Sequence, residues 1–327
     1  MKSDTAKTTG GWAERLSSGN RRSIATALTA VENDTPSAAG IMRDIHQLTG
    51  AALVVGLTGA PGVGKSTLLS ACIRELRLQA LSVGVVAVDP SSVFSGGAIL
   101  GDRVRMQEHA GDDGVFIRSV ASRGQLGGLF HSAARVIDVL DAAGKNIILV
   151  ETVGTGQSEI EIAEIAQLKV VVVQPGAGDD IQTMKAGVLE IADILVVNKS
   201  DQPYAERCVS DLRQMNSLRG ESASRIPIIL TNALNGDGVT ELVEAILGLQ
   251  SADQDRHPGI DRVRHLLVSD ACNRLRQELL GSAGTKEGAE LDSLSERVLT
   301  ADLTLAEAVE VLFADFQAVT RARKRAK

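Results

Sequence analysis

The sequence contains very few aromatic residues. Five Phe, one Trp and one Tyr make up 2% of the 327 residues, whereas 44% of the residues are hydrophobic. A core made from this chain must therefore consist mainly of Leu, Ile, Val and Ala. Such a core favours a doubly wound α/β sheet over an aromatic-rich β sandwich. The length suits one large α/β domain with helical additions, or two domains.

Cysteines and long apolar runs are also scarce, and acidic residues outnumber basic ones. Cys72, Cys208 and Cys272 show neither disulfide nor metal-binding spacing, so we expect free thiols in a reducing cytoplasm. The 34 basic residues are outnumbered by 41 acidic ones, and the net charge of −7 argues against a nucleic-acid partner. Because no apolar run approaches about 18 residues and the N-terminus lacks an apolar signal core, we expect a cytoplasmic protein without membrane contact.

A glycine-rich loop connects the apolar run at 51–57 to a segment with helical periodicity. It has the spacing Gly-x-x-x-x-Gly-Lys-Ser and comprises Gly59, Ala60, Pro61, Gly62, Val63, Gly64, Lys65, Ser66 and Thr67. Glycines let the backbone direct several N–H groups at one anion, at the positive end of the following helix. Lys65 can then reach the terminal phosphates, and the Ser66 hydroxyl can bind Mg²⁺. The complete spacing and its flanks predict a nucleoside triphosphate site rather than a simple turn.

Short apolar runs alternate with amphipathic segments in the middle of the chain. The runs lie at 82–88, 115–120, 147–150, 170–173, 194–197 and 226–230. This alternation predicts a mostly parallel sheet flanked by helices, with ligands at the carboxyl ends of the strands. We expect helices at about 12–48 and again after residue 238, with a Gly/Ser break at 281–288. The predicted parts are a tail and helices (1–48), a P-loop domain (49–250) and a helical arm (251–327).

Two polar turns indicate which base is bound. Asn198, Lys199 and Asp201 follow the run at 194–197, and a carboxylate there can accept both the N1–H and the 2-amino group of guanine, which adenine lacks. An ordinary strand-to-helix turn is the alternative, but the position of this motif after a P-loop favours guanine. The next run ends at Thr231, Asn232 and Ala233, where GTPases usually present a Ser-Ala turn whose backbone N–H contacts guanine O6. Asn232 replaces the commoner serine, and a backbone contact would survive that change.

Acidic residues at strand ends are candidates for a metal site. Glu151 ends the run at 147–150 and is followed by Gly154, whose backbone N–H would lie near the γ-phosphate. Asp89 ends the run at 82–88, and Asp102 lies in the next loop. Carboxylates, phosphate oxygens and water are the ligands that Mg²⁺ takes. For Asp102, a solvated loop position is an equal alternative.

Longer stretches around these residues resemble the MeaB/ArgK GTPases. These proteins are G-protein chaperones of adenosylcobalamin-dependent acyl-CoA mutases such as methylmalonyl-CoA mutase. The similar stretches are 89–106, 116–129 and 150–159, and the resemblance runs from about residue 15 to the end. It implies a P-loop NTPase of the signal-recognition/MinD-like branch, with N-terminal helices, a C-terminal dimerisation arm and a homodimeric assembly.

The resemblance also implies roles for individual residues. Lys65 and Ser66 would bind the phosphates and Mg²⁺, and the guanine would be bound by Asn198, Lys199 and Asp201. The metal site would contain Asp89, Asp102 and Glu151. Residues 178–187 are similar to the third switch of the family, which transmits the nucleotide state to the mutase. The sequence departs from the family at Thr155, Asp180 and Asn232.

The hydrolytic machinery is only partly visible in the sequence. No glutamine directly follows Gly154 to orient water, because Thr155 stands there. We therefore expect slow intrinsic hydrolysis of GTP to GDP and phosphate, with Lys185 or Arg105 completing the site when a partner reorders the switches. The chain lacks an Asp-x-His-x-x-Gly cobalamin motif, so a corrinoid would belong to the partner.

The expected partner is an acyl-CoA mutase, and an adenosyltransferase is a second candidate. Two other functions remain open. A P-loop small-molecule kinase or ATPase linked to amino-acid transport would prefer ATP, which Asp201 opposes. A metal-insertion GTPase would carry His-rich or Cys-x-x-Cys segments, which the sequence lacks.

Overall fold

A computed structural model describes most of the chain. The described residues are 11–89, 107–109, 111–121, 128–152, 165–176, 189–252 and 286–314, with single positions between 264 and 275. The chain divides into two compact units, Met1–His265 and Leu266–Lys327.

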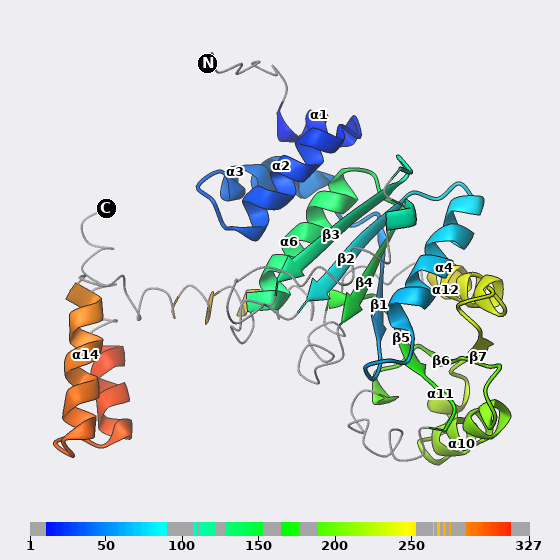
Figure 1. Cartoon of the computed structure of the whole chain (residues 1–327). Coiled ribbons are helices and arrows are strands. Elements are labelled where there is room, and N and C mark those ends of the chain that lie inside the picture. Colours follow the sequence, from blue (N-terminus) through cyan, green and yellow to red (C-terminus); the bar gives the residue numbers. More distant parts are fainter. Residues whose placement is uncertain are drawn as a thin grey trace. The chain divides into compact units, whose positions relative to one another are not determined.

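A seven-stranded parallel sheet forms the centre of the first unit (Figure 1). Its order is β3-β2-β4-β1-β5-β6-β7. The strands are β1 (Leu53–Thr58), β2 (Val83–Asp89), β3 (Val115–Ala121), β4 (Ile147–Thr152), β5 (Leu168–Val173), β6 (Ile194–Asn198) and β7 (Ile228–Thr231). Because β1 lies between β4 and β5, the direction of chain progression reverses beside it, where open α/β sheets bind their ligands. The predicted parallel sheet is confirmed.

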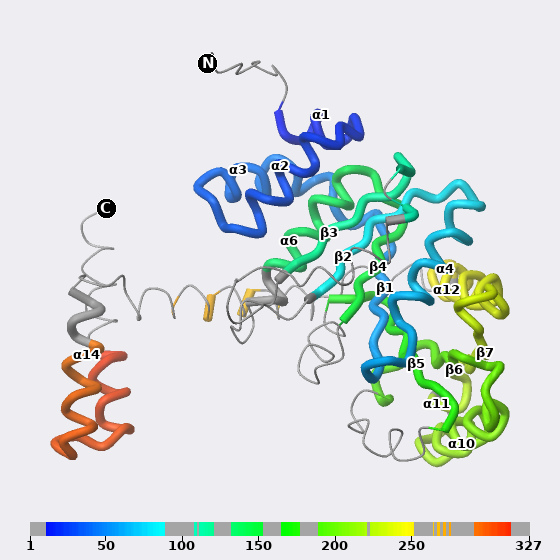
Figure 2. The backbone as a smooth tube through the Cα atoms, viewed as in Figure 1, coloured from blue at the N-terminus to red at the C-terminus, as the bar shows by residue number. Residues whose placement is uncertain are grey.

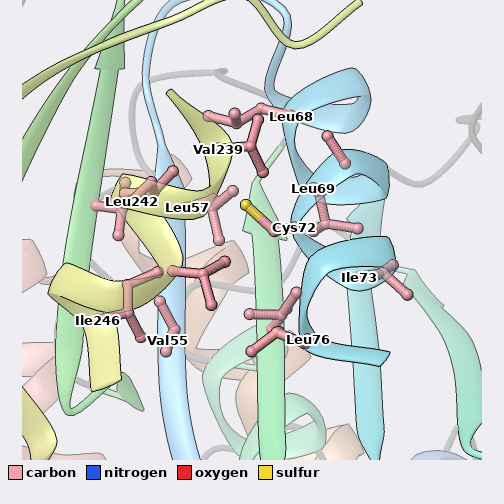
Figure 3. Close-up of a cluster of buried hydrophobic side chains, with 14 of the residues drawn as sticks. Val55, Leu57, Leu68, Leu69, Cys72, Ile73, Leu76, Val239, Leu242 and Ile246 are labelled. Carbon is pink, nitrogen blue, oxygen red and sulfur yellow. The ribbon is translucent and has the colours of Figure 1, made fainter. Parts of the chain in front are cut away.

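Helices cover both faces of this sheet, which explains why the strands lack polar alternation. All residues of β1, β4 and β6 are buried. On one face, α4 (Lys65–Leu78) and α12 (Val239–Ala252) pack against β1, as Figure 3 shows for Leu57, Leu69 and Leu242. On the other face, α6 (Gly128–Ala142) brings Leu140 beside Gly84 and Ile148, and α10 (Ala205–Leu218) packs on β5 and β6.

The N-terminal helices pack against α6 (Figure 1). They are α1 (Trp12–Ser17), α2 (Arg21–Glu32) and α3 (Ala38–Ile45), followed by the short η1 (His46–Leu48). The Asn20 side chain caps α2 by accepting a bond from the Ser23 N–H at 2.9 Å. Arg118 of β3 pairs with Glu32 at the end of α2. These contacts hold the helical segment on the sheet domain, and the predicted N-terminal helices are confirmed.

Several element ends differ from the sequence prediction by about two residues. The strand β7 begins at Ile228 rather than at 226, because Ile226 donates its N–H to Ala223 in a turn and Pro227 has no N–H to donate. The short helix α11 (Glu221–Ser224) precedes that turn. In contrast, β5 begins two residues earlier than predicted, at Leu168, which lies opposite Val55 of β1. Figure 2 traces the backbone from α10 through α11 into β7.

The second unit contains the helix α14 (Lys286–Leu299) and a helical segment at 305–314. The predicted Gly/Ser break at 281–288 was wrong for its last three residues, because α14 begins at Lys286. The helix includes Gly288, which a helix interior tolerates at a modest cost in stability. Thr304 and Glu307 form a capping box, in which the Thr304 N–H donates to Glu307 Oε2 at 2.9 Å. None of the described helices is both long enough and apolar enough to cross a membrane.

Candidate nucleotide-binding site

A cavity of about 610 Å³ opens at the carboxyl ends of β1, β4 and β6. It brings the predicted phosphate loop, the predicted base-binding turns and Glu151 to one place. The lining residues are Pro61, Gly62, Gly64, Lys65, Ser66, Thr67, Glu151, Thr152, Asn198, Lys199, Asp201, Gln202, Asn232, Ala233 and Leu234. The position agrees with the rule that parallel sheets bind ligands at the carboxyl ends of their strands.

The phosphate loop has a backbone path that requires glycine. Gly59 has a φ of 146°, and a Cβ atom there would lie 2.2 Å from the Val172 carbonyl oxygen. Gly64 has a φ of 95°, and its Cβ would lie 2.4 Å from Asn198 Nδ2. Among the described residues, no side chain caps the N-terminus of α4, which starts at Lys65. Gly64, Lys65, Ser66 and Thr67 line the cavity, so the N–H groups of the first turn lie beside it with the positive end of the helix dipole.

Lys65 lies across the loop with only 6% of its surface exposed. Its Nζ donates to the carbonyl oxygens of Gly59 at 2.7 Å and Ala60 at 3.0 Å. These bonds hold the ammonium group against the loop in a cavity-lining position. A phosphate bound by the loop N–H groups would lie within reach of this cation.

Ser66 and Glu151 form a buried pair beside the loop. The Ser66 Oγ donates to Glu151 Oε1 at 2.6 Å, and the two residues are 9% and 5% exposed. The sheet brings these two residues together, because Leu57 of β1, the strand before the loop, lies opposite Glu151 of β4. A hydroxyl and a carboxylate are hard oxygen donors, so this pair fits Mg²⁺.

The other predicted metal and catalytic residues are only partly covered by the structure. The backbone of Asp89 ends β2, beside β4, so it lies at the same edge of the sheet as Glu151. Asp102, Arg105, Gly154 and Lys185 lie outside the described residues. Within the described ranges, no three His, Cys, Asp or Glu side chains come together as a metal-binding group.

Asn198 connects the phosphate loop to the base-binding turns. Its side chain is 2% exposed and donates from Nδ2 to the Val63 carbonyl at 2.8 Å. Its Oδ1 accepts bonds from Thr231 Oγ1 and from the Ala233 N–H, both at 3.1 Å. Asn198 therefore fixes the relative position of both loops.

Lys199 and Asp201 follow Asn198 along the cavity. Lys199 has a left-handed backbone, with a φ of 58°, and its Nζ donates to the Gly62 carbonyl at 2.8 Å and to Gln174 Oε1 at 2.6 Å. The carboxylate of Asp201 accepts a bond from Asn232 Nδ2 at 2.9 Å. Both charged residues are thus bound to amide side chains.

Sequence reasoning missed part of this arrangement. It assigned only a backbone role to the turn at Asn232, but the structure shows that the Asn232 side chain contacts Asp201. Gln174, Gln202 and Leu234 belong to none of the sequence motifs, although Gln174 binds Lys199 and the other two line the cavity. The amide side chain that replaces serine at position 232 is the sequence signal that indicates this side-chain contact.

Comparisons with known proteins agree with this geometry. The family model described as "Methylmalonyl Co-A mutase-associated GTPase MeaB" matches residues 24–280. The GTPase ArgK of Escherichia coli is 39% identical over 248 residues, which are 73% of this chain and 75% of that protein. The mouse protein "Methylmalonic aciduria type A homolog, mitochondrial" is 37% identical over 203 residues, covering 60% of this chain and 48% of its own length.

The solved structures agree as well. A crystal structure described as "LAO/AO transport system kinase" aligns with a TM-score of 0.67 and 26% identity, covering 94% of this chain and 96% of that one. The chain therefore belongs to the MeaB family of P-loop GTPases.

Proposed function

We propose that this GTPase is a chaperone that protects, loads or reactivates an adenosylcobalamin-dependent acyl-CoA mutase. Binding and hydrolysis of GTP would move switch loops at the interface with the mutase. One observation carries the nucleotide part of the proposal, namely that a single cavity joins the phosphate loop to the turn with Asp201. The mutase part is supported by the description of the matching family.

In this proposal, different residues bind the phosphates, the Mg²⁺ ion and the base. The loop N–H groups and Lys65 would hold the phosphates, and Ser66 and Glu151 would hold Mg²⁺ together with Asp89 and Asp102. The ion, when bound, neutralises phosphate charge during phosphoryl transfer. Asp201 would accept the N1–H and the 2-amino group of guanine, while Lys199 would lie along the base. The turn at Asn232 and Ala233 would contact guanine O6 through the Ala233 N–H, which donates to Asn198 Oδ1 at 3.1 Å in the structure and would have to share that bond with O6.

Hydrolysis by the isolated chain would be slow in this proposal. Positioning and charge neutralisation supply most of the catalysis in phosphoryl transfer. Thr155 follows Gly154 in place of a water-orienting glutamine. Arg105 or Lys185 would complete the site when the mutase reorders the switch segments. A fast single-turnover rate that no mutase changes would contradict this part.

The assembly in the proposal is a cytoplasmic homodimer built through the C-terminal arm, and an adenosyltransferase is a further candidate partner. Apolar side chains on the second unit support the dimer. Leu299, Leu305, Val309 and Phe313 are between 43% and 85% exposed in the single chain. Leu305, Val309 and Phe313 recur at every fourth position of one helical segment and so share one face, and an exposed apolar face commonly marks an interaction surface. Light scattering of the purified protein should give the mass of two chains.

Exchange of one base-reading residue tests the nucleotide part. Asp201→Asn should weaken GTP binding by at least about 100-fold and favour xanthosine triphosphate, because the new amide pairs with the 2-oxo group of xanthine but not with guanine. Titration with fluorescent nucleotides measures both affinities. Unchanged preference for GTP in this variant would overturn the assignment of the base site. Tight ATP binding by the native chain would instead favour a small-molecule kinase, the activity in the description of the aligned solved structure.

A purified mutase tests the chaperone part. The GTP hydrolysis rate should rise when the cognate acyl-CoA mutase is added, and the two proteins should co-elute on a gel-filtration column with a GTP analogue. A mutase whose substrate class does not match serves as the control. Absence of both effects with methylmalonyl-, isobutyryl-, ethylmalonyl- and 2-hydroxyisobutyryl-CoA mutases would contradict the proposal.

A further inference from the structure

The three strands at one side of the sheet end at the same level. Val173 of β5 lies opposite Val197 of β6, and Thr231 of β7 lies opposite Asn198 of β6. The next residue after β5 is Gln174, and the next residue after β7 is Asn232. Both neighbouring strands of β6 therefore present an amide side chain beside the turn that carries Lys199 and Asp201.

Gln174 holds the ammonium group of Lys199. Its Oε1 accepts a bond from Lys199 Nζ at 2.6 Å, and the Gly62 carbonyl accepts a second at 2.8 Å. One bond goes to the end of β5 and the other to the phosphate loop, so the side chain of Lys199 is fixed at its far end. Because Gln174 is neutral, it orients the lysine without cancelling the positive charge.

Asn232 holds the carboxylate of Asp201, and is itself fixed from several sides. Its Nδ2 donates to Asp201 Oδ1 at 2.9 Å, while its Oδ1 accepts the Leu234 N–H at 3.1 Å. Its backbone N–H donates to the Asp237 carbonyl at 2.9 Å. The side chain therefore has one orientation, with the NH₂ group toward Asp201.

The amide bond to Asp201 leaves room for the base. A carboxylate has about four acceptor sites on its two oxygens, so one bond from Asn232 leaves positions for the two donors of guanine. Asp201 itself is exposed. An exposed carboxylate that is not held must lose rotational freedom when it binds a base in one orientation, which reduces affinity.

We infer that Asn232 and Gln174 are positioning residues for base recognition, Asn232 through Asp201 and Gln174 through Lys199. This inference rests on the proposed guanine site. The two amides have different effects, since only Asp201 reads the 2-amino group. Asn232 therefore sharpens the choice between guanine and hypoxanthine, whereas Gln174 supports binding of either base.

Inosine triphosphate, which lacks the 2-amino group, separates the two roles. Asn232→Ala should weaken GTP binding by about 3- to 10-fold, the value of one hydrogen bond, and should weaken binding of inosine triphosphate less, so that the ratio of the two affinities falls. Gln174→Ala should weaken both nucleotides by a similar factor and leave the ratio unchanged. Titration calorimetry measures all four affinities.

Variants that keep these contacts should recover nucleotide affinity. Asn232→Ser retains a donor for Asp201, and Gln174→Asn retains a neutral amide acceptor for Lys199, so both should restore part of the lost affinity. The matched control is Asn235→Ala, since Asn235 is an exposed amide in the same turn that bonds to Asp237 and does not line the cavity. It should bind both nucleotides as the native chain does.

The outcomes separate this inference from the base-site assignment. If native protein prefers GTP and Asp201→Asn loses that preference, but Asn232→Ala keeps the native affinity ratio, the inference is wrong while the guanine site stands. If Gln174→Ala binds both nucleotides normally, the role of Gln174 is wrong. If the native chain does not distinguish GTP from inosine triphosphate, the base-site assignment itself fails. Circular dichroism and thermal unfolding confirm that each variant is folded.

Discussion

At the scale of single residues, the phosphate loop depends on two positions that no larger residue can occupy. Gly59 and Gly64 combine a positive φ with close neighbours, Val172 on β5 and Asn198 on β6. The neighbour of Gly59 is backbone, which cannot rotate away as a side chain can. The loop thus packs directly on the strands beside it, and its glycines serve packing as well as phosphate binding.

Substitution of Gly59 should therefore disrupt the site. Gly59→Ala would place a methyl group 2.2 Å from the Val172 carbonyl oxygen, and relief of that clash must displace the loop. We expect GTP affinity to fall by at least about 10-fold, since backbone strain of this kind costs roughly 1–3 kcal/mol. Nucleotide titration measures the loss.

A second glycine gives the control for this change. Gly248 lies in α12, and a Cβ there would meet no atom of the described residues within 4 Å. Gly248→Ala should leave GTP affinity unchanged and raise the free energy of unfolding by about 0.5–1 kcal/mol through helix propensity. Equal effects of the two alanines on nucleotide binding would contradict the steric argument.

At the scale of elements, the short helix η2 (Gln107–His109) is fastened to α4 by a polar cluster. Ser70 Oγ donates to Glu108 and lies 2.8 Å from His109 Nε2, and Arg74 pairs with Glu108 at 2.8 Å. Ser70 and His109 are both buried. These contacts attach the chain after residue 106 to the same helix that starts at the phosphate loop.

Burial lowers the pKa of His109 below its ordinary value of 6.5, while Glu108 opposes this and Arg74 adds to it. The unfolded chain then binds more protons than the folded chain at acidic pH, so stability rises with pH up to about 6.5 and levels off above it. His109→Gln should reduce this part of the pH dependence. Urea unfolding at about pH 5 and pH 7 measures it, and an unchanged difference would contradict the assignment.

Glu108 contributes a separate acidic effect. Its pKa is also lowered, first by the hydrogen bond from Ser70, so its stabilisation is present above the ordinary carboxyl pKa of 4.5 and is lost as pH falls below that value. The comparison with His109→Gln is therefore made above the range in which Glu108 titrates. Asp112 also faces His109 and is held by Arg77, and its pKa is lowered as well.

At the scale of the whole molecule, the nucleotide site depends on the sheet rather than on any one element. Its lining comes from the loop after β1, the end of β4, and the turns after β6 and β7. A ligand that binds all of these should stabilise the folded unit as a whole. GTP at 100 times its dissociation constant should add about 2.7 kcal/mol to the free energy of unfolding.

Thermal unfolding in the presence of GTP or ATP tests this expectation. The midpoint of the first unit should rise with Mg²⁺ and GTP, and ATP at the same concentration should leave it nearly unchanged because adenine lacks the donors that Asp201 accepts. An equal shift by both nucleotides would contradict guanine selection. The Asp201→Asn variant serves as the reference for binding through the phosphates alone.

How much of the site the sequence predicts depends on how far apart the interacting residues lie along the chain. The phosphate loop and the Asn-Lys-x-Asp turn were predicted because each is contiguous and lies after an apolar run. The contact of Gln174 with Lys199 joins residues 25 apart, and that of Asn232 with Asp201 joins residues 31 apart. Neither spacing belongs to a local motif, so neither contact was predicted.

The sequence by itself determined the parallel α/β architecture, the nucleotide class and the family, because these depend on local periodicity and on short motifs whose chemistry is complete in a few residues. Only the tertiary structure decided which strands are neighbours. The order β5-β6-β7 places two amides beside Lys199 and Asp201, and β1 beside β4 places Glu151 against Ser66. Strand order arises from packing of helices over the whole sheet, and residue spacing does not encode it.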